Sequence, residues 1–463
     1  MVREMRVTTI RSEGLAHLSY FVSSDGEAFV VDPRRDVDVY LKLSRETKSE
    51  IVHIFETHRN EDYVTGSLEL QYHVPDAQIN HSKETDFKFG DNSLFDGDTF
   101  DVGKTRIECV YTPGHTEDSM SYLVADMSVG PNPFAFFTGD TLFVNEIGRT
   151  DLADITRHEE MTREIFHSLH EKVLPVGDGV VVFPGHGAGS VCGGDIGERE
   201  FSTIGYERAS NPWLQMEEED FVHARLRQSL TLSTYFKHCR KLNSIGPPLL
   251  SSLDPPRNLD PASFEDLLKK PGHLVVDTRS PDFFVCGHIP RAMSLPLSSM
   301  GKSAAWVLNP DDSFLLVLER TEDLKLAMNY LHRIGFDNVV GYLGSGMDGW
   351  YEKGKLRSLL QTYTLEEVKE QLGKGEMTMI DVRQLHEAEE EFIVGSAFAP
   401  LTNLAENMSK FDRDKPTVTI CPRGARASTA ASIFKRAGYK NVGVTLEGIE
   451  GWKDRGYPVR TGK

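Results

Sequence analysis

The first half of the chain alternates short apolar runs with segments of helical periodicity. Continuous apolar runs at residues 28–31 and 51–55 have the length of buried strands. Between Met161 and Val173, apolar residues recur every four positions, which predicts an amphipathic helix. We therefore expect an α/β domain in which buried strands alternate with helices. Polar residues of catalytic types follow several of the apolar runs, at the sheet edge where α/β proteins usually present their chemistry.

A proline-rich segment interrupts this pattern. The pairs Pro247-Pro248 and Pro255-Pro256 lie in a stretch with few apolar positions, a composition typical of linkers. We expect an N-terminal domain at 1–245 and a linker at 246–260. The length of 463 residues agrees with about three domains of roughly 150 residues each.

After this segment the sequence repeats with a period of about one hundred residues, the size of a small domain. The pattern Asp-x-Arg follows an apolar strand at 277–279 and again at 381–383, and a Gly-Trp pair recurs near the end of each copy. The repeat predicts two related domains, at 261–357 and 358–463.

Composition restricts the partners. The net charge of -19 argues against nucleic acid and anionic membranes, which attract basic surfaces. No apolar run of about 18 residues and no apolar leader after Met1 are found, so we expect a cytoplasmic protein that does not contact membranes. The five cysteines are scattered without C-x-x-C spacing, which indicates neither disulfides nor a zinc knuckle. The sequence does not determine whether the chain forms a homo-oligomer.

The second copy carries a candidate nucleophile. Cys421 ends an apolar strand and precedes a helical pattern, so backbone N–H groups should surround its sulfur. Arg423 and Arg426 add positive charge, and such surroundings lower the pKa of a thiol. We expect Cys421 to be a nucleophilic thiolate and the two arginines to hold anions through their guanidinium groups.

The first copy lacks this chemistry. Leu318 stands opposite Cys421, and the residues after it are largely acidic, so we expect this copy to be inactive. Cys286 belongs to another segment of the repeat, and we expect it to be a buried packing residue.

Three further segments carry candidate metal ligands. Residues 56–63 resemble the motif T-H-x-H-x-D-H of the metallo-β-lactamase fold, with His58 as its first histidine and with Asn60 and Tyr63 in place of the second and third histidines. His115 in Thr-Pro-Gly-His and Asp140 in Thr-Gly-Asp match further ligand motifs of that fold. The resemblance implies an αββα sandwich, and the repeated copies resemble rhodanese domains, which are α/β domains with parallel sheets.

The family resemblance also implies how the metal is held. Two histidines and one carboxylate, His58, His115 and Asp140, form a set that leaves coordination positions open and suits non-heme iron. We expect one Fe(II), with zinc as a substitute, because the two missing histidines make a dinuclear zinc site unexpected. The remaining motif residues Asp62, Tyr63 and His186 are expected to surround and orient the ligands. Cys192, six residues after His186, is a candidate accessory thiol.

The whole chain resembles the fusions of a persulfide dioxygenase with a rhodanese sulfurtransferase that detoxify sulfide. The resemblance implies that a low-molecular-weight thiol persulfide is oxidised by O2 to sulfite. Sulfite attack on a Cys421 persulfide would then release thiosulfate.

Three alternatives remain open. A zinc-dependent thioester hydrolase similar to glyoxalase II would need an intact metal motif, which Asn60 and Tyr63 interrupt. A cysteine-dependent phosphatase would need five residues between cysteine and arginine, whereas four separate Cys421 from Arg426. The repeated copies could also form a sulfur-relay or docking module without catalysis of their own.

Overall fold

The computed structural model describes residues 5–85, 87–152, 155–228 and 235–461. The chain divides into two compact units. The first comprises Met1–Leu253 with His332–Gly335, and the second comprises Asp254–Leu331 with Phe336–Lys463. Both copies of the repeat lie in the second unit, so the predicted boundary between them stays a prediction.

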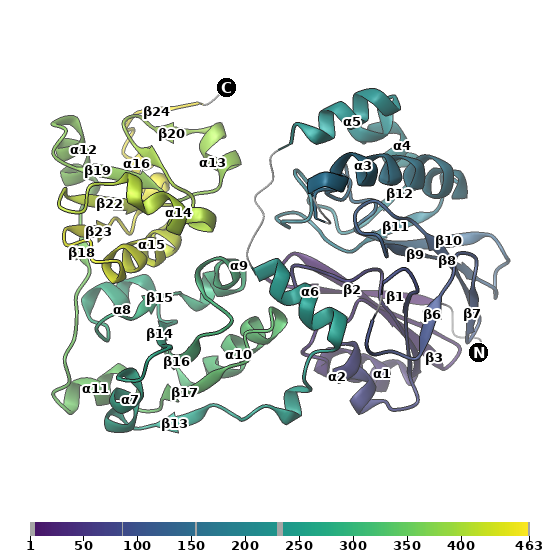
Figure 1. The fold of residues 1–463 in the computed structure, drawn as a ribbon, viewed down its shortest axis with the longest axis horizontal. Helices are drawn as coiled ribbons and strands as arrows, with labels where there is room; N and C mark the ends of the chain where they lie inside the picture. Colours follow the sequence, from purple (N-terminus) through teal and green to yellow (C-terminus); the bar gives the residue numbers. More distant parts are fainter. Residues whose placement is uncertain (1–4, 86, 153–154, 229–234, 462–463) are drawn as a thin grey trace. The chain divides into compact units, whose positions relative to one another are not determined.

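The first unit contains two six-stranded sheets (Figure 1). In spatial order, the first sheet is β1 (Arg6–Ser12), β2 (His17–Ser24), β3 (Glu27–Val31), β4 (Glu50–Phe55), β5 (Gln78–Ser82) and β6 (Asn92–Leu94). The second sheet is β12 (Ser202–Thr203), β11 (Val181–Pro184), β10 (Pro133–Gly139), β9 (Met120–Asp126), β8 (Thr105–Tyr111) and β7 (Thr99–Val102). Strands β3 and β4 confirm the two strands expected from the apolar runs.

Successive side chains of each strand point to opposite faces of its sheet, so each sheet packs against the other sheet on one face and against helices on the other. Phe29 and Phe137 pack in the cluster between the two sheets, whereas their neighbours Val30 and Phe136 lie in the clusters on the outer faces. Helices cover these outer faces, and the unit is an αββα sandwich, as predicted. The helices of the unit are α1 (Asp38–Thr47), α2 (Ser67–His73), α3 (His158–His167), α4 (Ile204–Ser210), α5 (Glu218–Leu226) and α6 (Tyr235–Ile245).

The helix expected between Met161 and Val173 changes its winding. It is α-helical to His167 and continues as a π-helix over Ser168–Val173. Pro175 lies in the 3-10 turn Leu174–Val176 that follows, and it has no amide hydrogen with which to continue a regular helix.

The second unit contains two five-stranded sheets with the same strand order, which confirms the internal repeat. The first sheet is β13 (Arg257–Leu259), β17 (Val339–Leu343), β16 (Ser313–Val317), β14 (His273–Asp277) and β15 (Met293–Ser294). The second is β18 (Gln361–Thr362), β23 (Val442–Val444), β22 (Thr417–Ile420), β19 (Thr378–Asp381) and β21 (Ala397–Phe398). The strand pairs in both sheets are parallel, as expected. A small antiparallel pair joins β20 (Phe392–Ile393) to β24 (Val459–Arg460).

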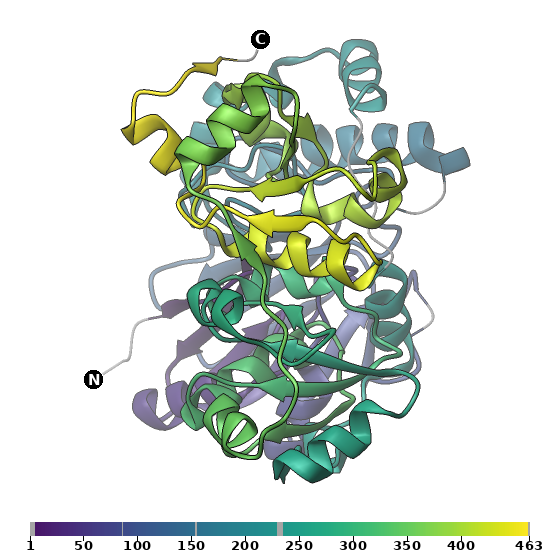
Figure 2. The ribbon, with the colours of Figure 1, turned by 90° about the vertical axis from the view of Figure 1, so that its left-hand side faces the viewer.

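Helices flank these parallel strands, whose colours run from teal through green to yellow in Figure 2. The helices of the first copy are α7 (Pro261–Leu268), α8 (Pro281–Cys286), α9 (Leu297–Val307), α10 (Leu324–Arg333) and α11 (Gly346–Glu352). Those of the second copy are α12 (Leu365–Gly373), α13 (Leu385–Glu390), α14 (Leu404–Asn407), α15 (Ala425–Arg436) and α16 (Gly448–Asp454).

The structure corrects two expectations. Strand β13 lies inside the segment expected to be a linker, because its backbone completes the sheet by pairing with β17. Cys286 is exposed rather than buried, because it ends the short helix α8. Among the described residues, no helix is both long and apolar enough to cross a membrane.

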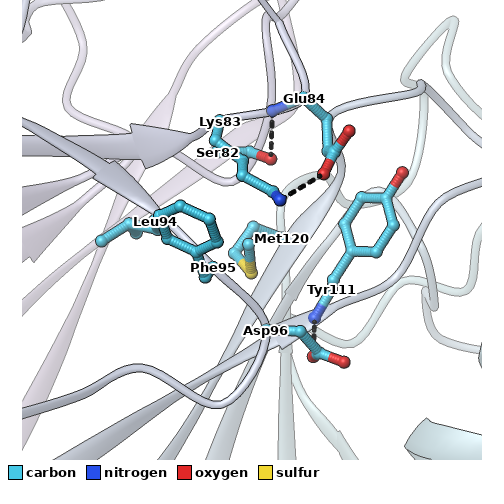
Figure 3. Close-up of a pocket in the computed structure, with 8 residues that line it drawn as sticks. All are labelled: Ser82, Lys83, Glu84, Leu94, Phe95, Asp96, Tyr111 and Met120. Carbon is cyan, nitrogen blue, oxygen red and sulfur yellow. Dashed lines mark hydrogen bonds and ion pairs between the residues drawn. The ribbon is translucent and has the colours of Figure 1, made fainter.

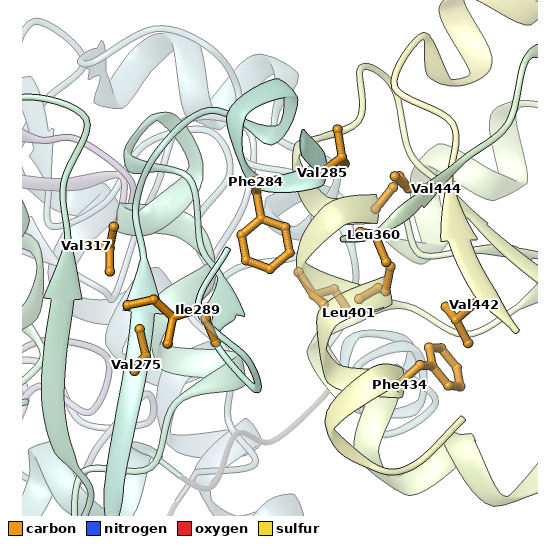
Figure 4. Packing of buried hydrophobic residues seen from close by; sticks show 14 of the residues in the cluster. Val275, Phe284, Val285, Ile289, Val317, Leu360, Leu401, Phe434, Val442 and Val444 are labelled. Atoms are coloured by element: carbon orange, nitrogen blue, oxygen red, sulfur yellow. The ribbon is translucent and has the colours of Figure 1, made fainter. Parts of the chain in front are cut away.

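The two copies of the repeat share one hydrophobic cluster (Figure 4). Phe284 of the first copy points towards Leu360 and Leu401 of the second. A hydroxyl pair joins the copies as well, with 2.8 Å between Ser294 Oγ and Ser428 Oγ. The copies therefore support each other inside this unit.

Candidate metal centre and sulfur-transfer site

The predicted metal ligands and His186 lie just beyond the ends of four strands from both sheets. His58 follows β4, His115 follows β8, Asp140 follows β10 directly and His186 follows β11. All four side chains are buried. The two sheets of the sandwich thus bring together residues that are far apart in the sequence.

The three proposed ligands have the spacing that one cation requires. The distance from Asp140 Oδ2 to His115 Nε2 is 3.5 Å, and that to His58 Nε2 is 3.9 Å. Donor atoms bound at about 2.0–2.2 Å from one metal ion lie about 3 to 4 Å from each other. The arrangement fits a single ion between these atoms.

Both histidines are oriented through their second ring nitrogen. His115 Nδ1 lies 2.8 Å from the carbonyl oxygen of Arg149, which can only accept, so Nδ1 carries the hydrogen. Thr57 donates its hydroxyl hydrogen to Asp32 Oδ2 at 2.7 Å, so its oxygen accepts from His58 Nδ1 at 2.9 Å. The Nε2 atoms have no hydrogen-bond partner among the described residues and are left to face the proposed ion. Such orientation is typical of histidines that bind metals.

Asp140 is suited to bind a cation as a carboxylate. Burial opposes its ionisation, but the adjacent His186, His115 and His58 outweigh that effect and hold the pKa of Asp140 well below its usual value. The side chain is therefore negatively charged at neutral pH.

The residues expected around the ligands form a second group. His186 Nδ1 lies 2.8 Å from Asp140 Oδ1, and His186 Nε2 lies 3.0 Å from Asp62 Oδ2. The ligand atoms of Asp62, His186 and Cys192 all lie within 4.8 Å of one another, so this group could also hold an ion. Burial and the carboxylates Asp62 and Asp140 raise the pKa of Cys192 well above its usual value, so without a metal the thiol is protonated.

Tyr63 packs beside the second group. Its ring stacks on His17 with 3.9 Å between ring centroids, and its hydroxyl has no hydrogen-bond partner within the described parts of the chain. Burial raises the pKa of Tyr63 well above the usual value. The side chain thus adds a neutral hydroxyl in place of a motif histidine.

Sequence reasoning missed Glu61. Its carboxylate is buried, with one oxygen 3.2 Å from His115 Nε2, and it groups with His58 and His115 as a potential ligand. The signal in the sequence was an acidic residue next to Asn60, where the motif loses its second histidine.

The candidate sulfur-transfer site lies in the second unit. Cys421 follows β22 directly, and its Sγ accepts a hydrogen bond from the amide of Ala427 in α15 at 3.3 Å. Gly424 allows the tight loop between strand and helix, because its φ of +85° is strained for any other residue. The loop therefore has the strand-to-helix form that was expected.

The expected low pKa of Cys421 is wrong in direction. Burial of the sulfur raises the pKa of Cys421 above its usual value and outweighs the backbone amides and Arg426, which lower it. Arg426 forms two hydrogen bonds with the carboxylate of Glu387, at 2.6 and 2.7 Å. Arg423 is exposed and bonds to Glu450. Neither arginine therefore presents an uncompensated charge to the sulfur.

The first copy has no thiol at the matching position. Leu318 follows β16 as Cys421 follows β22, and its side chain is buried. The acidic Glu319 comes next, as expected for a copy without sulfur chemistry.

A surface pocket of the first unit lies outside both candidate sites (Figure 3). The residues that line it include Lys83, Phe95, Tyr111 and Met120, but none of the predicted metal ligands. The proposed metal centre is instead formed by buried side chains.

Comparisons with known proteins identify the class of protein. Residues 13–186 match the metallo-beta-lactamase superfamily, and residues 260–353 and 364–455 each match the rhodanese-like domain. The chain therefore consists of a metallo-beta-lactamase domain followed by two rhodanese-like domains.

The metallo-beta-lactamase domain is homologous to the persulfide dioxygenases. The chain is 28% identical to the mitochondrial persulfide dioxygenase ETHE1 of Bos taurus over 201 residues, which are 42% of this chain and 70% of the relative. It is also 29% identical to the mitochondrial hydroxyacylglutathione hydrolase of Saccharomyces cerevisiae over 205 residues, covering 40% of this chain and 67% of that enzyme. Identity alone does not separate the two activities.

A solved structure shares most of the fold. The crystal structure of a metallo-beta-lactamase from Staphylococcus aureus aligns with a TM-score of 0.65 and 28% identity. The alignment covers 74% of this chain and 99% of that one, so it extends beyond the metallo-beta-lactamase domain.

Proposed function

We propose that the chain is a persulfide dioxygenase coupled to a thiosulfate-forming sulfurtransferase. The observation that carries this proposal is the donor set of the first unit. His58, His115 and Asp140 converge at the spacing of one ion, while Asn60 and Tyr63 replace the histidines of a dinuclear site. This set suits mononuclear Fe(II), with zinc as a substitute.

The protein's part in the first reaction is to hold and shield the reacting groups. When bound, Fe(II) would supply the oxygen chemistry by which a thiol persulfide, O2 and water give the thiol, sulfite and two protons. Asp140 provides negative charge, and the backbone of Arg149 and the hydroxyl of Thr57 fix the two imidazoles. Burial of these side chains keeps bulk water away from the ligands.

The second reaction takes place at Cys421. The Cys421 thiolate first attacks the sulfane sulfur of a second thiol persulfide, and that thiol leaves. The resulting Cys421 persulfide presents its outer sulfur to sulfite, and the sulfite sulfur attacks it. The bond between the two persulfide sulfurs breaks, thiosulfate leaves and the Cys421 thiolate remains. The amide of Ala427 stabilises this thiolate. Arg426, whose charge acts on Cys421 although it is paired with Glu387, is the residue that we propose to attract the sulfite anion.

The test is O2 uptake by anaerobically iron-loaded protein given glutathione, coenzyme A or cysteine persulfide. We expect O2 consumption equal to the persulfide oxidised, with thiosulfate as the product of wild type and sulfite as the product of Cys421→Ser. Absence of O2 consumption with all three persulfides would contradict the dioxygenase. Thiosulfate formation by Cys421→Ser at the wild-type rate would contradict the coupled transferase.

A zinc-dependent thioester hydrolase is the second candidate. It is favoured by the group of Asp62, His186 and Cys192, which could hold a second ion, and by the similarity to hydroxyacylglutathione hydrolase. Metal analysis with a thioesterase assay separates the candidates, because the hydrolase requires two zinc ions per chain and thioester turnover.

A further inference from the structure

Asn60 does not replace the motif histidine as a ligand. Its side-chain Nδ2 donates to the carbonyl oxygen of His58 at 3.2 Å, and its backbone N–H donates to the same oxygen at 3.0 Å. Its own carbonyl accepts from Asn243 Nδ2 at 2.7 Å. These bonds hold the Asn60 amide against the loop backbone.

Glu61 is the next residue, and its carboxylate lies at the proposed metal centre. One Oε1 atom is 3.2 Å from His115 Nε2, and the ligand atoms of Glu61, His58 and His115 all lie within 4.8 Å of one another. Glu61 is therefore within reach of an ion held by His58 and His115. Asp140 reaches the same two histidines, with Oδ2 3.5 Å from His115 Nε2 and 3.9 Å from His58 Nε2.

The Glu61 side chain is 1% exposed. Among the described residues, its polar contact is the 3.2 Å approach of Oε1 to His115 Nε2, and Oε2 has no hydrogen-bond partner. The guanidinium of Arg240 donates to the carbonyl oxygen of Leu152. Burial of a charged group is costly unless it is paired, and a bound cation would pair with both oxygens of the carboxylate.

We propose that Glu61 is a fourth protein ligand of the cation that His58, His115 and Asp140 hold. The inference rests on the proposed metal centre, but not on the dioxygenase reaction. Two carboxylates and two neutral imidazoles would balance a divalent ion completely. If the ion takes six ligands, four protein ligands would still leave room for a sulfur ligand and O2.

The test uses the full chain loaded with Co(II). The dissociation constant is measured by competition with a chromogenic chelator, and the visible absorption spectrum reports the coordination of the ion. We expect Glu61→Gln to weaken Co(II) binding by at least about tenfold and to change the spectrum. Glu61→Asp, which keeps the carboxylate on a shorter side chain, should bind with intermediate affinity.

Glu207→Gln is the matched control. Glu207 is also buried, but it bonds to Asn145 and Asn211 of its own region and is not among the proposed ligands. This variant should bind Co(II) with wild-type affinity and spectrum. The thermal midpoint of metal-free Glu61→Gln is measured beside that of wild type to show that the variant folds.

Wild-type affinity and spectrum in Glu61→Gln would overturn the proposal and leave Glu61 as an ion-pair partner of His115. If Glu61→Gln does not fold, the proposal is tested with Glu61→Asp. An unchanged Co(II) spectrum and affinity in that variant would also overturn the proposal. O2 uptake in wild type is measured separately. Loss of Co(II) affinity in Glu61→Gln without O2 uptake in wild type would refute the dioxygenase while supporting the fourth ligand.

Discussion

At the residue scale, the orientation of His58 depends on a chain of hydrogen bonds from Asp32 through Thr57. Thr57→Val keeps the shape of the side chain but removes the oxygen that accepts from His58 Nδ1. We expect this variant to bind Fe(II) or Co(II) about 10- to 100-fold more weakly, measured by chelator competition. Thr105→Val is the control, because its buried hydroxyl donates to the carbonyl oxygen of Val102, outside the proposed metal centre. Equal affinities of the two variants would contradict the orienting role.

The raised pKa of Cys421 predicts a particular pH dependence. Because an acid with a raised pKa ionises only at higher pH, alkylation of Cys421 by iodoacetamide should have its midpoint above the ordinary thiol value of roughly 8.5. Glu387→Gln should lower this midpoint, because Arg426 would lose its carboxylate partner. Mass spectrometry of the Cys421 peptide separates the reaction from that of exposed Cys286.

Glu450→Gln is the control for this prediction. It releases Arg423, which is exposed and solvated, so the midpoint should hardly change. A wild-type midpoint well below the ordinary thiol value, or equal shifts in both variants, would contradict the explanation.

These residues show where sequence reasoning succeeds and where it fails. The strand-to-helix position of Cys421 followed from local patterns, but the sign of its pKa shift did not. That sign depends on burial of the sulfur and on Glu387, whose contact with Arg426 is set by tertiary structure. Glu61 was missed because it occupies a variable position of the metal motif, and the motif does not show that this side chain lies beside the ligands.

At the element scale, the Cys421 loop depends on the start of α16. The amide of Ile449 donates to the carbonyl oxygen of Cys421 at 2.9 Å, and Gly448 lies directly against this loop. A Cβ at Gly448 would stand 2.1 Å from the carbonyl oxygen of Pro422. The turn before α16 therefore holds the backbone that surrounds the sulfur.

Gly448→Ala should therefore destabilise the second unit and impair sulfur transfer. Its φ of +63° costs an alanine about 1–2 kcal/mol, and the clash adds to that. Gly438→Ala is the matched control, because Gly438 has a φ of +91° but nothing within 4 Å of its Cβ position. Thermal unfolding and thiosulfate formation should both fall further in Gly448→Ala, with metal affinity unchanged. Equal losses in the two variants would contradict the steric explanation.

Strands with a clear apolar pattern of their own were predicted from the sequence, whereas a strand held by pairing with a distant segment was not. Strands β3 and β4 came from continuous apolar runs, and the repeat came from Asp-x-Arg at 277–279 and 381–383. Strand β13 was not expected, because Arg257–Leu259 carries little apolar pattern and is held by backbone pairing with β17.

At the scale of the whole molecule, the first rhodanese-like copy packs against the helix that carries the sulfur-transfer loop. Helix α15, which begins just after Gly424, contacts α8, α9 and β15 of the first copy. Leu401 and Phe434 of the second copy belong to the same hydrophobic cluster as Phe284 of the first. A copy without a catalytic thiol thus contributes to the packing of the copy that has one.

This packing predicts that residues 358–463 alone are less stable than residues 254–463. Removal of the first copy would expose apolar side chains of the second to water and leave the Ser428 hydroxyl without Ser294. We expect the shorter fragment to unfold at a lower temperature and its Cys421 to be alkylated faster at a given pH, because the sulfur would be less protected. Circular dichroism and mass spectrometry measure the two effects. Equal thermal midpoints and equal alkylation rates would show that the second copy folds independently, and the first copy would then need a role other than support.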